Sequence, residues 1–333
     1  MTRKQWTWVG VGAGIVAIVA IAIVLLAGGS DDSQPEVQTA PLTGLPDPNG
    51  VANGRFAITV KVNNTNANTQ AAIDEADVVY EEVVEGQYTR LAAIFNSHAP
   101  DKVGPVRSVR RTDASIVWPI GGVFVFSGGA QASLDSINEA PVVQVDETRG
   151  GSMMFRDDSA EAPYNLWAHV DQMFTNEKDA KPVPPPALFT YRADDTPLTG
   201  TPVASVRVGF QAGFDVTWTW LDDQRAWGRT TGSQAASPTQ GDGKAVTPKN
   251  VVVLKVHYAG GVGVEGSEAE LTGRGEALVF TAGREIKGTW ERSDKEDVTK
   301  LLDADGNEIE LTPGQTWVEL PDTSYAVEVT PAS

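Results

Sequence analysis

An uninterrupted apolar segment near the N-terminus constrains this chain more than any other feature. The segment from Trp6 to Ala27 contains no charged residue, and as a helix it would span about 33 Å, enough to cross a bilayer core of roughly 30 Å. Arg3 and Lys4 precede it and two aspartates follow it, so the positive-inside rule places the N-terminus in the cytoplasm. The sequence therefore predicts a single-pass plasma-membrane protein whose bulk is extracytoplasmic.

A cleaved secretory signal is the alternative interpretation of this segment. The apolar region of such a signal usually covers about 7–15 residues and ends at a small-residue cleavage site. The segment here is longer, and Ala27-Gly28-Gly29 matches a cleavage site poorly, so we prefer the uncleaved anchor. Both interpretations export the chain that follows Ser30.

The composition limits the partners and the chemistry. The net charge is -18, and so acidic a chain repels nucleic acid phosphates, which excludes nucleic acid as a partner. The chain has no cysteine, which excludes disulfides, thiolate metal sites, a cysteine nucleophile and lipid attachment through cysteine. With only three histidines as well, we expect neither a metal site nor a cofactor.

The pattern along the chain predicts four segments. Residues 1–29 form the cytoplasmic tip and the anchor, and residues 30–50, rich in Ser, Asp, Gln, Pro and Gly, predict a disordered tether. Strand and helix patterns mix over residues 51–203, whereas strand patterns dominate residues 204–331 after the proline-rich KPVPPPA stretch. The fold class predicted is α+β, with an N-terminal membrane helix, a mixed α/β-sheet domain and a smaller β-rich domain.

Charged residues concentrate in two motifs, EEVVEGQYTR at 81–90 and GPVRSVRR at 104–111. A planar guanidinium group beside carboxylates is usually fixed in bidentate pairs or directed at an anion. Arginines at this density in an acidic chain therefore indicate a ligand-binding site. Its predicted members are the polar residues of these motifs and of adjacent ones: Glu81, Glu82, Glu85, Arg90, Arg107, Ser108, Arg110, Arg111, Asp113, Arg156 and Asn165.

The first motif predicts a β-hairpin with Gly86-Gln87 as a two-residue loop. In that register Glu81 and Glu85 lie diagonal to Arg90 on one face of the hairpin. Glu82 points to the other face.

Three interpretations of the charged group are open. It is a structural ion-pair network, an anion or carbohydrate site, or a pair of catalytic carboxylates drawn from Glu81, Glu82 and Glu85. A nearby Arg90 lowers the pKa of a carboxyl group, which opposes the acid role that glycan hydrolysis needs. We therefore expect a non-catalytic binding or scaffold factor for an anionic wall fragment or an envelope protein, with an envelope glycan or peptide hydrolase or transferase as the alternative.

The chain resembles the YerB-like family of bacterial lipoproteins. The motifs that carry the resemblance follow in a fixed order over nearly the whole exported part: LTGLP, EADVVYEEVVEGQYTR, GPVRSVRR, FRDDSAEAPYNLW, GEALVFTAGREIKGTWERS and DGNEIELTPGQTWVEL. The resemblance implies an envelope protein with a mixed α+β domain followed by a smaller β-rich domain. Two features depart from the family pattern: the lipid-bearing cysteine is absent, and Pro163-Tyr164-Asn165 stands where a Pro-His-Asn element is usual.

Overall fold

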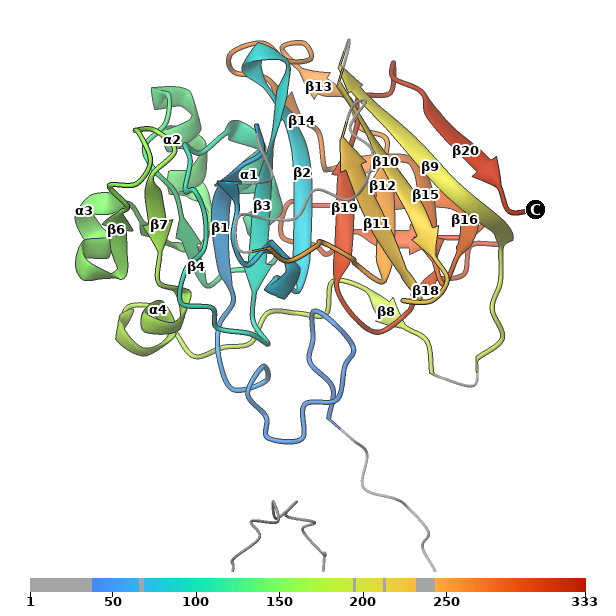
Figure 1. The fold of residues 1–333 in the computed structure, drawn as a ribbon, viewed down its shortest axis with the longest axis horizontal. Helices are drawn as coiled ribbons and strands as arrows, with labels where there is room; N and C mark the ends of the chain where they lie inside the picture. Colours follow the sequence, from blue (N-terminus) through green and yellow to red (C-terminus); the bar gives the residue numbers. More distant parts are fainter. Residues whose placement is uncertain (1–37, 66–68, 194–195, 212–213, 232–242) are drawn as a thin grey trace, which may run out of the picture. The chain divides into compact units, whose positions relative to one another are not determined.

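The computed structural model describes residues 38–333 except 66–68, 194–195, 212–213 and 232–242 (Figure 1). The predicted membrane anchor lies outside the described residues. Within the described residues, no helix has the length and apolar character needed to cross a membrane. Val37–Ser333 form one compact unit.

A single large mixed sheet forms the centre of this unit. Its hydrogen-bonded strand order is β11-β10-β9-β16-β15-β12-β19-β2-β3-β1-β4-β5, with β17 paired to β16 and β20 paired to β9. The β12–β19, β19–β2, β1–β4 and β4–β5 pairs are parallel. The strands of this sheet are β1 (Ile58–Asn63), β2 (Val78–Val84), β3 (Tyr88–Phe95), β4 (Val123–Val125), β5 (Val143–Val145), β9 (Thr201–Gln211), β10 (Phe214–Leu221), β11 (Ala226–Thr231), β12 (Asn250–Leu254), β15 (Gly273–Thr281), β16 (Arg284–Arg292), β17 (Lys300–Leu302), β19 (Thr316–Leu320) and β20 (Val327–Pro331).

Helices and short strand pairs surround this sheet. The α-helices lie around β1, β3 and β4, while the other end of the sheet is built from strands (Figure 1). The short pairs are β6 (Met154–Arg156) with β7 (Leu166–Ala168), β8 (Thr190–Tyr191) with β18 (Glu310–Leu311), and β13 (Tyr258–Ala259) with β14 (Glu268–Ala269). The helices are α1 (Arg111–Val117), α2 (Gln131–Glu139), α3 (Glu147–Gly150) and α4 (Val170–Asn176), with the 3-10 turns η2 (Ile73–Glu75), η3 (Glu85–Gln87) and η4 (Gly151–Met153). The described part is therefore mixed α/β, as predicted, with a large sheet and few helices.

Strands β1 and β2 lie at the centre of the core. Every residue of ITVKVN in β1 and of VVYEEVV in β2 is buried. Strands covered on both faces usually carry nearly continuous apolar sequence, so the charged residues within these two strands must find partners inside the protein. The partners of these buried charged residues form part of the candidate site.

The sheet continues across the boundary predicted at residues 203 and 204. Strand β19 is responsible, because it pairs in parallel with β12 on one side and with β2 on the other. The division into two folding domains stays a prediction, and the β19–β2 pair is the seam that joins the two parts.

The predicted disordered tether is wrong for residues 38–50. Leu42 is fully buried in the core, and Asp47 is 8% exposed. The Asp47 carboxylate accepts hydrogen bonds from the backbone N–H groups of Val51, at 2.8 Å, and Asn53, at 3.0 Å. The composition of the segment predicted disorder because it does not reveal these contacts. A buried leucine and a hydrogen-bonded aspartate help to order this proline- and glycine-rich loop.

Candidate functional site

The β2–β3 hairpin is shifted by one residue from the predicted register. Gly86 has φ 78°, a left-handed conformation that suits glycine, and the loop contains three residues, Glu85–Gln87, instead of two. Glu82 consequently lies opposite Arg90. The prediction that Glu81 shares a face with Arg90 is wrong, because a one-residue shift moves every side chain to the other face of a strand.

Lys61 forms a fully buried charged centre with two carboxylates. Its Nζ donates to Glu82 Oε1 and, at 2.7 Å, to Asp113 Oδ1, and none of the three side chains is exposed. Burial raises the pKa of Asp113 to about 6; the Lys61 charge opposes this rise and the Glu82 charge adds to it. Asp113 Oδ2 also accepts from the Arg110 backbone N–H at 2.6 Å, so the centre holds the start of α1. We call Lys61, Glu82 and Asp113 the Lys61 centre.

Arg90, Arg107, Arg110 and Glu85 adjoin this centre, and we call them the arginine cluster. Arg90 and Arg110 both direct Nη1 at the Ser108 carbonyl, at 2.9 and 3.3 Å. Arg110 holds both carboxylate oxygens of Glu85 with one edge of its guanidinium group, with Nε at 2.8 Å from Oε2 and Nη2 on Oε1. Arg90 Nη2 lies 3.8 Å from the same Glu85 Oε1. Two guanidinium groups therefore share one carboxylate.

The positive charges of the arginine cluster repel one another and destabilise the charged form of each guanidinium group. The pKa of Arg90 is lowered to about 10, first by burial and then by the positive charges of Arg110 and Arg107, against the opposing effect of Glu85 and Glu82. Partial burial alone would raise the pKa of Glu85, but the hydrogen bond and charge of Arg110 lower it below its usual value. The cluster has an excess of positive charge that an added anion would relieve.

Arg107 is the member of the cluster with unused donors. Its Nη1 is buried and has no hydrogen-bond partner. Its guanidinium carbon lies 4.9 Å from the centre of the Tyr164 ring, an exposed aromatic side chain. Among the described residues, no carboxylate forms an ion pair with Arg107. Leaving a buried donor without a partner costs free energy. Arg107 Nη1 is therefore the group of the cluster that would gain most from an added hydrogen-bond acceptor.

A second polar group lies next to Arg107. The Ser127 N–H donates to the Arg107 carbonyl at 2.9 Å, and Ser127 Oγ donates to Glu147 Oε1 at 3.1 Å. Arg156 binds the same Glu147 carboxylate, with Nη2 at 2.7 Å from Oε1, and donates from Nη1 to Asn165 Oδ1 at 2.7 Å. The structure thus brings Arg156 and Asn165 near Arg107, but they are already paired with one another or with Glu147.

Arg111, another predicted member, is directed elsewhere. Its Nη2 forms an ion pair with Glu268 Oε2 at 2.8 Å, on the neighbouring β14. Arg111 begins α1, so the backbone turn that follows Arg110 separates the two guanidinium groups.

Glu81 belongs to a third charged group, on the opposite face of β2. It is fully buried and bound by Arg229 Nη2 at 2.7 Å, and it accepts from Asn64 and Thr89 as well. Glu319 lies beside it on β19, where burial, and then the charge of Glu81, raise the pKa of Glu319 well above its usual value. The Glu319 carboxyl accepts from Trp218 Nε1 at 2.6 Å. We call Glu81, Arg229 and Glu319 the Arg229 centre.

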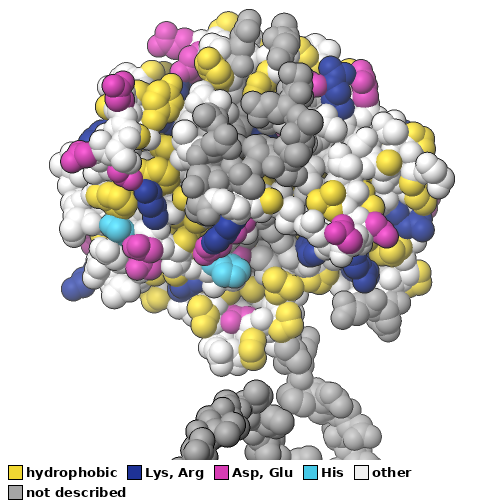
Figure 2. All heavy atoms as spheres, in the orientation of Figure 1, with side chains coloured by type: hydrophobic (Ala, Val, Ile, Leu, Met, Phe, Trp, Pro, Cys, Tyr) yellow, Lys and Arg dark blue, Asp and Glu magenta, His cyan; other side chains and the backbone are white. Residues whose placement is uncertain are grey.

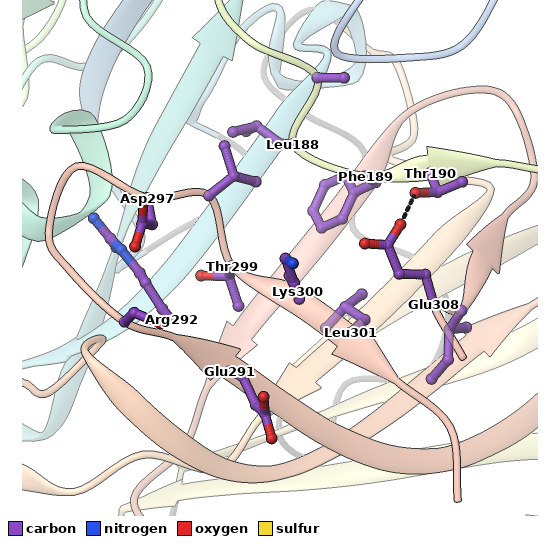
Figure 3. A pocket seen from close by; sticks show the side chains of 14 residues that line it. Leu188, Phe189, Thr190, Glu291, Arg292, Asp297, Thr299, Lys300, Leu301 and Glu308 are labelled. Carbon is purple, nitrogen blue, oxygen red and sulfur yellow. Dashed lines mark hydrogen bonds between the residues drawn. The ribbon is translucent and has the colours of Figure 1, made fainter. Parts of the chain in front are cut away.

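A cavity of about 460 Å³ lies apart from these charged groups (Figure 3). Leu188, Phe189 and Leu301 supply apolar lining, and Lys300 lies among them (Figure 3). Thr190 Oγ1 donates to Glu308 Oε2 at 2.8 Å on its far side. Its volume is in the range of small-molecule sites, but none of the predicted site residues lines it.

Asp101, His169 and Asp171 form a group with metal-ligand chemistry. One donor atom from each lies within 4.8 Å of the others. His169 Nδ1 is, however, already hydrogen-bonded to Asp101 Oδ1 at 2.7 Å, and the Asp101 side chain is 77% exposed. The hydrogen bond accounts for the arrangement, and we assign no metal to it.

Comparison with known proteins identifies the family. Residues 42–182 match the N-terminal domain, and residues 206–318 the C-terminal domain, of the proteins of unknown function described as DUF3048. The chain belongs to the DUF3048 family. It is 28% identical over 299 residues to "Putative lipoprotein YerB" of Bacillus subtilis (strain 168), a match that covers 86% of this chain and 87% of that protein. The predicted YerB-like relationship is therefore confirmed.

The fold of this DUF3048 protein is also that of YerB. The crystal structure of YerB from Bacillus subtilis superposes with a TM-score of 0.74 at 24% identity, covering 87% of this chain and 99% of that chain. At this identity the structural match supports the shared fold alone. It agrees with the mixed α/β sheet described above.

Sequence reasoning missed three charged residues of this DUF3048 protein: Lys61, Arg229 and Glu319. Lys61 carried a signal, since it is the one charged residue within the predicted strand FAITVKV at 56–62. Arg229 and Glu319 carried none, because both meet Glu81 only through strands that are far away in the sequence.

Proposed function

We propose that this protein is a cell-envelope factor that binds an anionic ligand at the arginine cluster without transforming it. The Arg107 guanidinium group carries the proposal: its Nη1 is buried and unpartnered beside two other guanidinium groups that share the single carboxylate of Glu85. A phosphate or carboxylate would supply the missing acceptor and offset the excess positive charge.

The local backbone supports an anionic ligand. The Val109 N–H donates to the Gly128 carbonyl at 3.0 Å, so the turn before α2 lies beside the arginine motif. No side chain caps the first turn of α2, which leaves the positive end of its dipole unopposed. The exposed ring of Tyr164 beside Arg107 adds a flat apolar surface for a sugar or another uncharged part of the ligand.

The relative's name supports an envelope location. YerB is named a lipoprotein, which suggests a membrane-associated extracytoplasmic protein. This chain has no cysteine through which a lipid could be attached, so we propose that the apolar segment 6–27 replaces the lipid as anchor, with the N-terminus in the cytoplasm. An anionic wall fragment or an acidic segment of an envelope protein would then be within reach of the cluster.

Retention on isolated cell wall tests the proposed function. Full-length protein in mild detergent is incubated with the wall and then sedimented, and Arg107→Ala is compared with Arg207→Ala. Arg207 is a matched control because it is an exposed arginine that is paired with Asp215 and Glu328. We expect Arg107→Ala to weaken retention about tenfold or more, since a hydrogen bond to a charged group contributes roughly 1.5–3 kcal/mol.

The same assay separates binding from hydrolysis. Soluble glycan and peptide fragments are measured in the supernatant, and we expect none above the background of wall alone. Release of fragments that Glu85→Gln abolishes would replace the binder with the hydrolase or transferase. Equal retention of both arginine variants would mean that the cluster is not the binding site.

A further inference from the structure

Residues 39–54 form an ordered loop at one end of the molecule, and we call them the N-terminal loop (blue, at the bottom of Figure 1). The Ala40 N–H donates to the Leu45 carbonyl at 2.8 Å, and Asn53 Nδ2 donates to the Thr39 carbonyl at 2.8 Å. Leu42 is fully buried and fixes the loop to the core. The loop is therefore a defined surface.

The outer side of the N-terminal loop is apolar. Leu45 is 41% exposed and Val51 is 47% exposed, and Pro46 and Pro48 are exposed as well. Asp47 is the one charged residue of the loop, and its carboxylate is buried and engaged by the loop's own backbone. Figure 2 shows hydrophobic side chains gathered on this end of the molecule. In a chain with a net charge of -18, a loop whose one charged side chain is only 8% exposed is a distinct surface.

The position of the loop in the sequence indicates what covers it. Residues 28–37 alone separate the predicted membrane segment from the first described residue, Gln38. Ten residues reach at most about 35 Å even when fully extended. Anionic headgroups repel an acidic domain, and least so where it exposes the least charge. The loop that follows the predicted anchor in the sequence is thus also a surface that anionic headgroups would repel little.

We propose that the N-terminal loop contacts the outer surface of the membrane bilayer, with Leu45 and Val51 at the level of the headgroups. Apolar side chains gain free energy on leaving water, and the one charged group of the loop, the Asp47 carboxylate, keeps its hydrogen bonds to backbone N–H groups at this depth. The contact also orients the molecule. Strand β1 starts at Ile58, directly after the loop, and ends at Asn63, which pairs with Arg90. The arginine cluster therefore faces away from the bilayer, toward the wall.

The absence of cysteine makes a clean test available. Single substitutions Leu45→Cys, Val51→Cys and Val264→Cys introduce one labelling site each into the full-length chain. Val264 is a matched control, because it is also a valine with 47% exposure and lies between β13 and β14, at the opposite end of Figure 1. Each variant is labelled with an environment-sensitive fluorophore and reconstituted into vesicles of phosphatidylethanolamine and phosphatidylglycerol that contain spin-labelled lipid.

We expect the spin-labelled lipid to quench the labels at positions 45 and 51 more strongly than the label at position 264. Adding Val51→Glu to the Leu45→Cys chain should reduce the lipid-contacting population about tenfold or more, because a charge replaces an apolar side chain at the interface. Val264→Glu in the same chain should not reduce it. Vesicle flotation and thermal unfolding confirm that each variant is anchored and folded.

Three results would overturn the proposal. Equal quenching at positions 51 and 264 in floating vesicles would show that the loop has no preference for lipid. Quenching at position 45 that Val51→Glu leaves unchanged would show that the apolar surface is not responsible. Crosslinking of the labelled position to a second copy of the chain, without lipid quenching, would assign the surface to self-association. None of these results bears on whether Arg107 binds an anion.

Discussion

The Lys61 centre and the arginine cluster lie side by side, both combine cations with carboxylates, and they differ in depth. All three side chains of the Lys61 centre are fully buried, and its one cation serves two carboxylates. In the arginine cluster the Glu85 side chain is 41% exposed. Arg107 Nη1 has no hydrogen-bond partner there, but neither has Glu82 Oε2 in the Lys61 centre, so exposure is the clearer difference. A fully buried charge needs partners within the protein. A partly exposed cation is also stabilised by water, so it does not need a carboxylate partner before a ligand binds. Depth therefore separates the structural centre from the cluster for which we propose a binding role.

The Arg229 centre shows the same rule on the other face of β2. Glu81 and Glu319 are directly opposed across the parallel β2–β19 pair, and both are fully buried. One guanidinium group cannot neutralise two close carboxylates at this depth, so burial and the charge of Glu81 raise the pKa of Glu319 well above its usual value. Adjacent residues Glu81 and Glu82 thus anchor two separate centres, one on each face of one strand.

The largest effect should follow removal of the Lys61 ammonium group. Lys61→Met leaves Glu82 and Asp113 buried without a cation, and we expect the free energy of unfolding to fall by about 3–5 kcal/mol. Denaturant unfolding of the purified protein measures it. Lys300→Met, at an exposed lysine of β17, is the control and should change stability by less than about 0.5 kcal/mol. Similar stability of the two variants would contradict a structural role for the Lys61 centre.

Stability should also depend on the protonation of Asp113. The folded-state pKa of about 6 exceeds the unfolded value of 3.8, so the folded protein binds this proton more tightly. The stabilisation is complete below pH 3.8 and is lost as the pH rises through 6, with a slope near 1.4 kcal/mol per pH unit between them, about 3 kcal/mol in all. Unfolding measured from pH 4 to pH 7 should show this loss in the wild type and not in Asp113→Asn. Parallel curves for the two proteins would refute the assignment.

A smaller and asymmetric effect is expected for the two carboxyls of the Arg229 centre. Glu81→Gln removes the charged partner of Arg229 and should cost about 1–3 kcal/mol of unfolding free energy. Glu319→Gln replaces a carboxyl whose pKa is raised by burial with a neutral amide of similar shape and should cost less than about 1 kcal/mol at pH 7. Thermal unfolding of both variants gives the comparison. The reverse order of stabilities would mean that Glu319, not Glu81, carries the charge.

The smallest effects on stability should come from the arginine cluster. Arg110→Ala removes a pair with a partly exposed carboxylate and should cost at most about 1 kcal/mol, and Arg107→Ala should change stability by about 0.5 kcal/mol or less. Both values come from the same denaturant curves as the Lys61 variant. A loss above about 2 kcal/mol in Arg107→Ala would place this residue with the structural centres and weaken the binding proposal.

Much of the site could be predicted because its members are dense in the sequence. The two motifs supply Glu82, Glu85, Arg90, Arg107 and Arg110, and the structure brings all five into one region. The register of the hairpin could not be predicted, since it depends on whether the loop around Gly86 has two residues or three, and both loops suit glycine. That single residue decided which glutamate meets Arg90.

The sequence by itself determined the mixed α/β class, the membership of the YerB-like family and the region of the arginine cluster, because apolar periodicity and dense charge are local properties. Only the tertiary structure decided that Lys61 pairs with Asp113, that Glu81 pairs with Arg229 and that Arg107 stays unpaired. The pairing partners lie on strands far apart in the chain, and the energy of a charge depends on its depth and neighbours. Both are set by the fold as a whole.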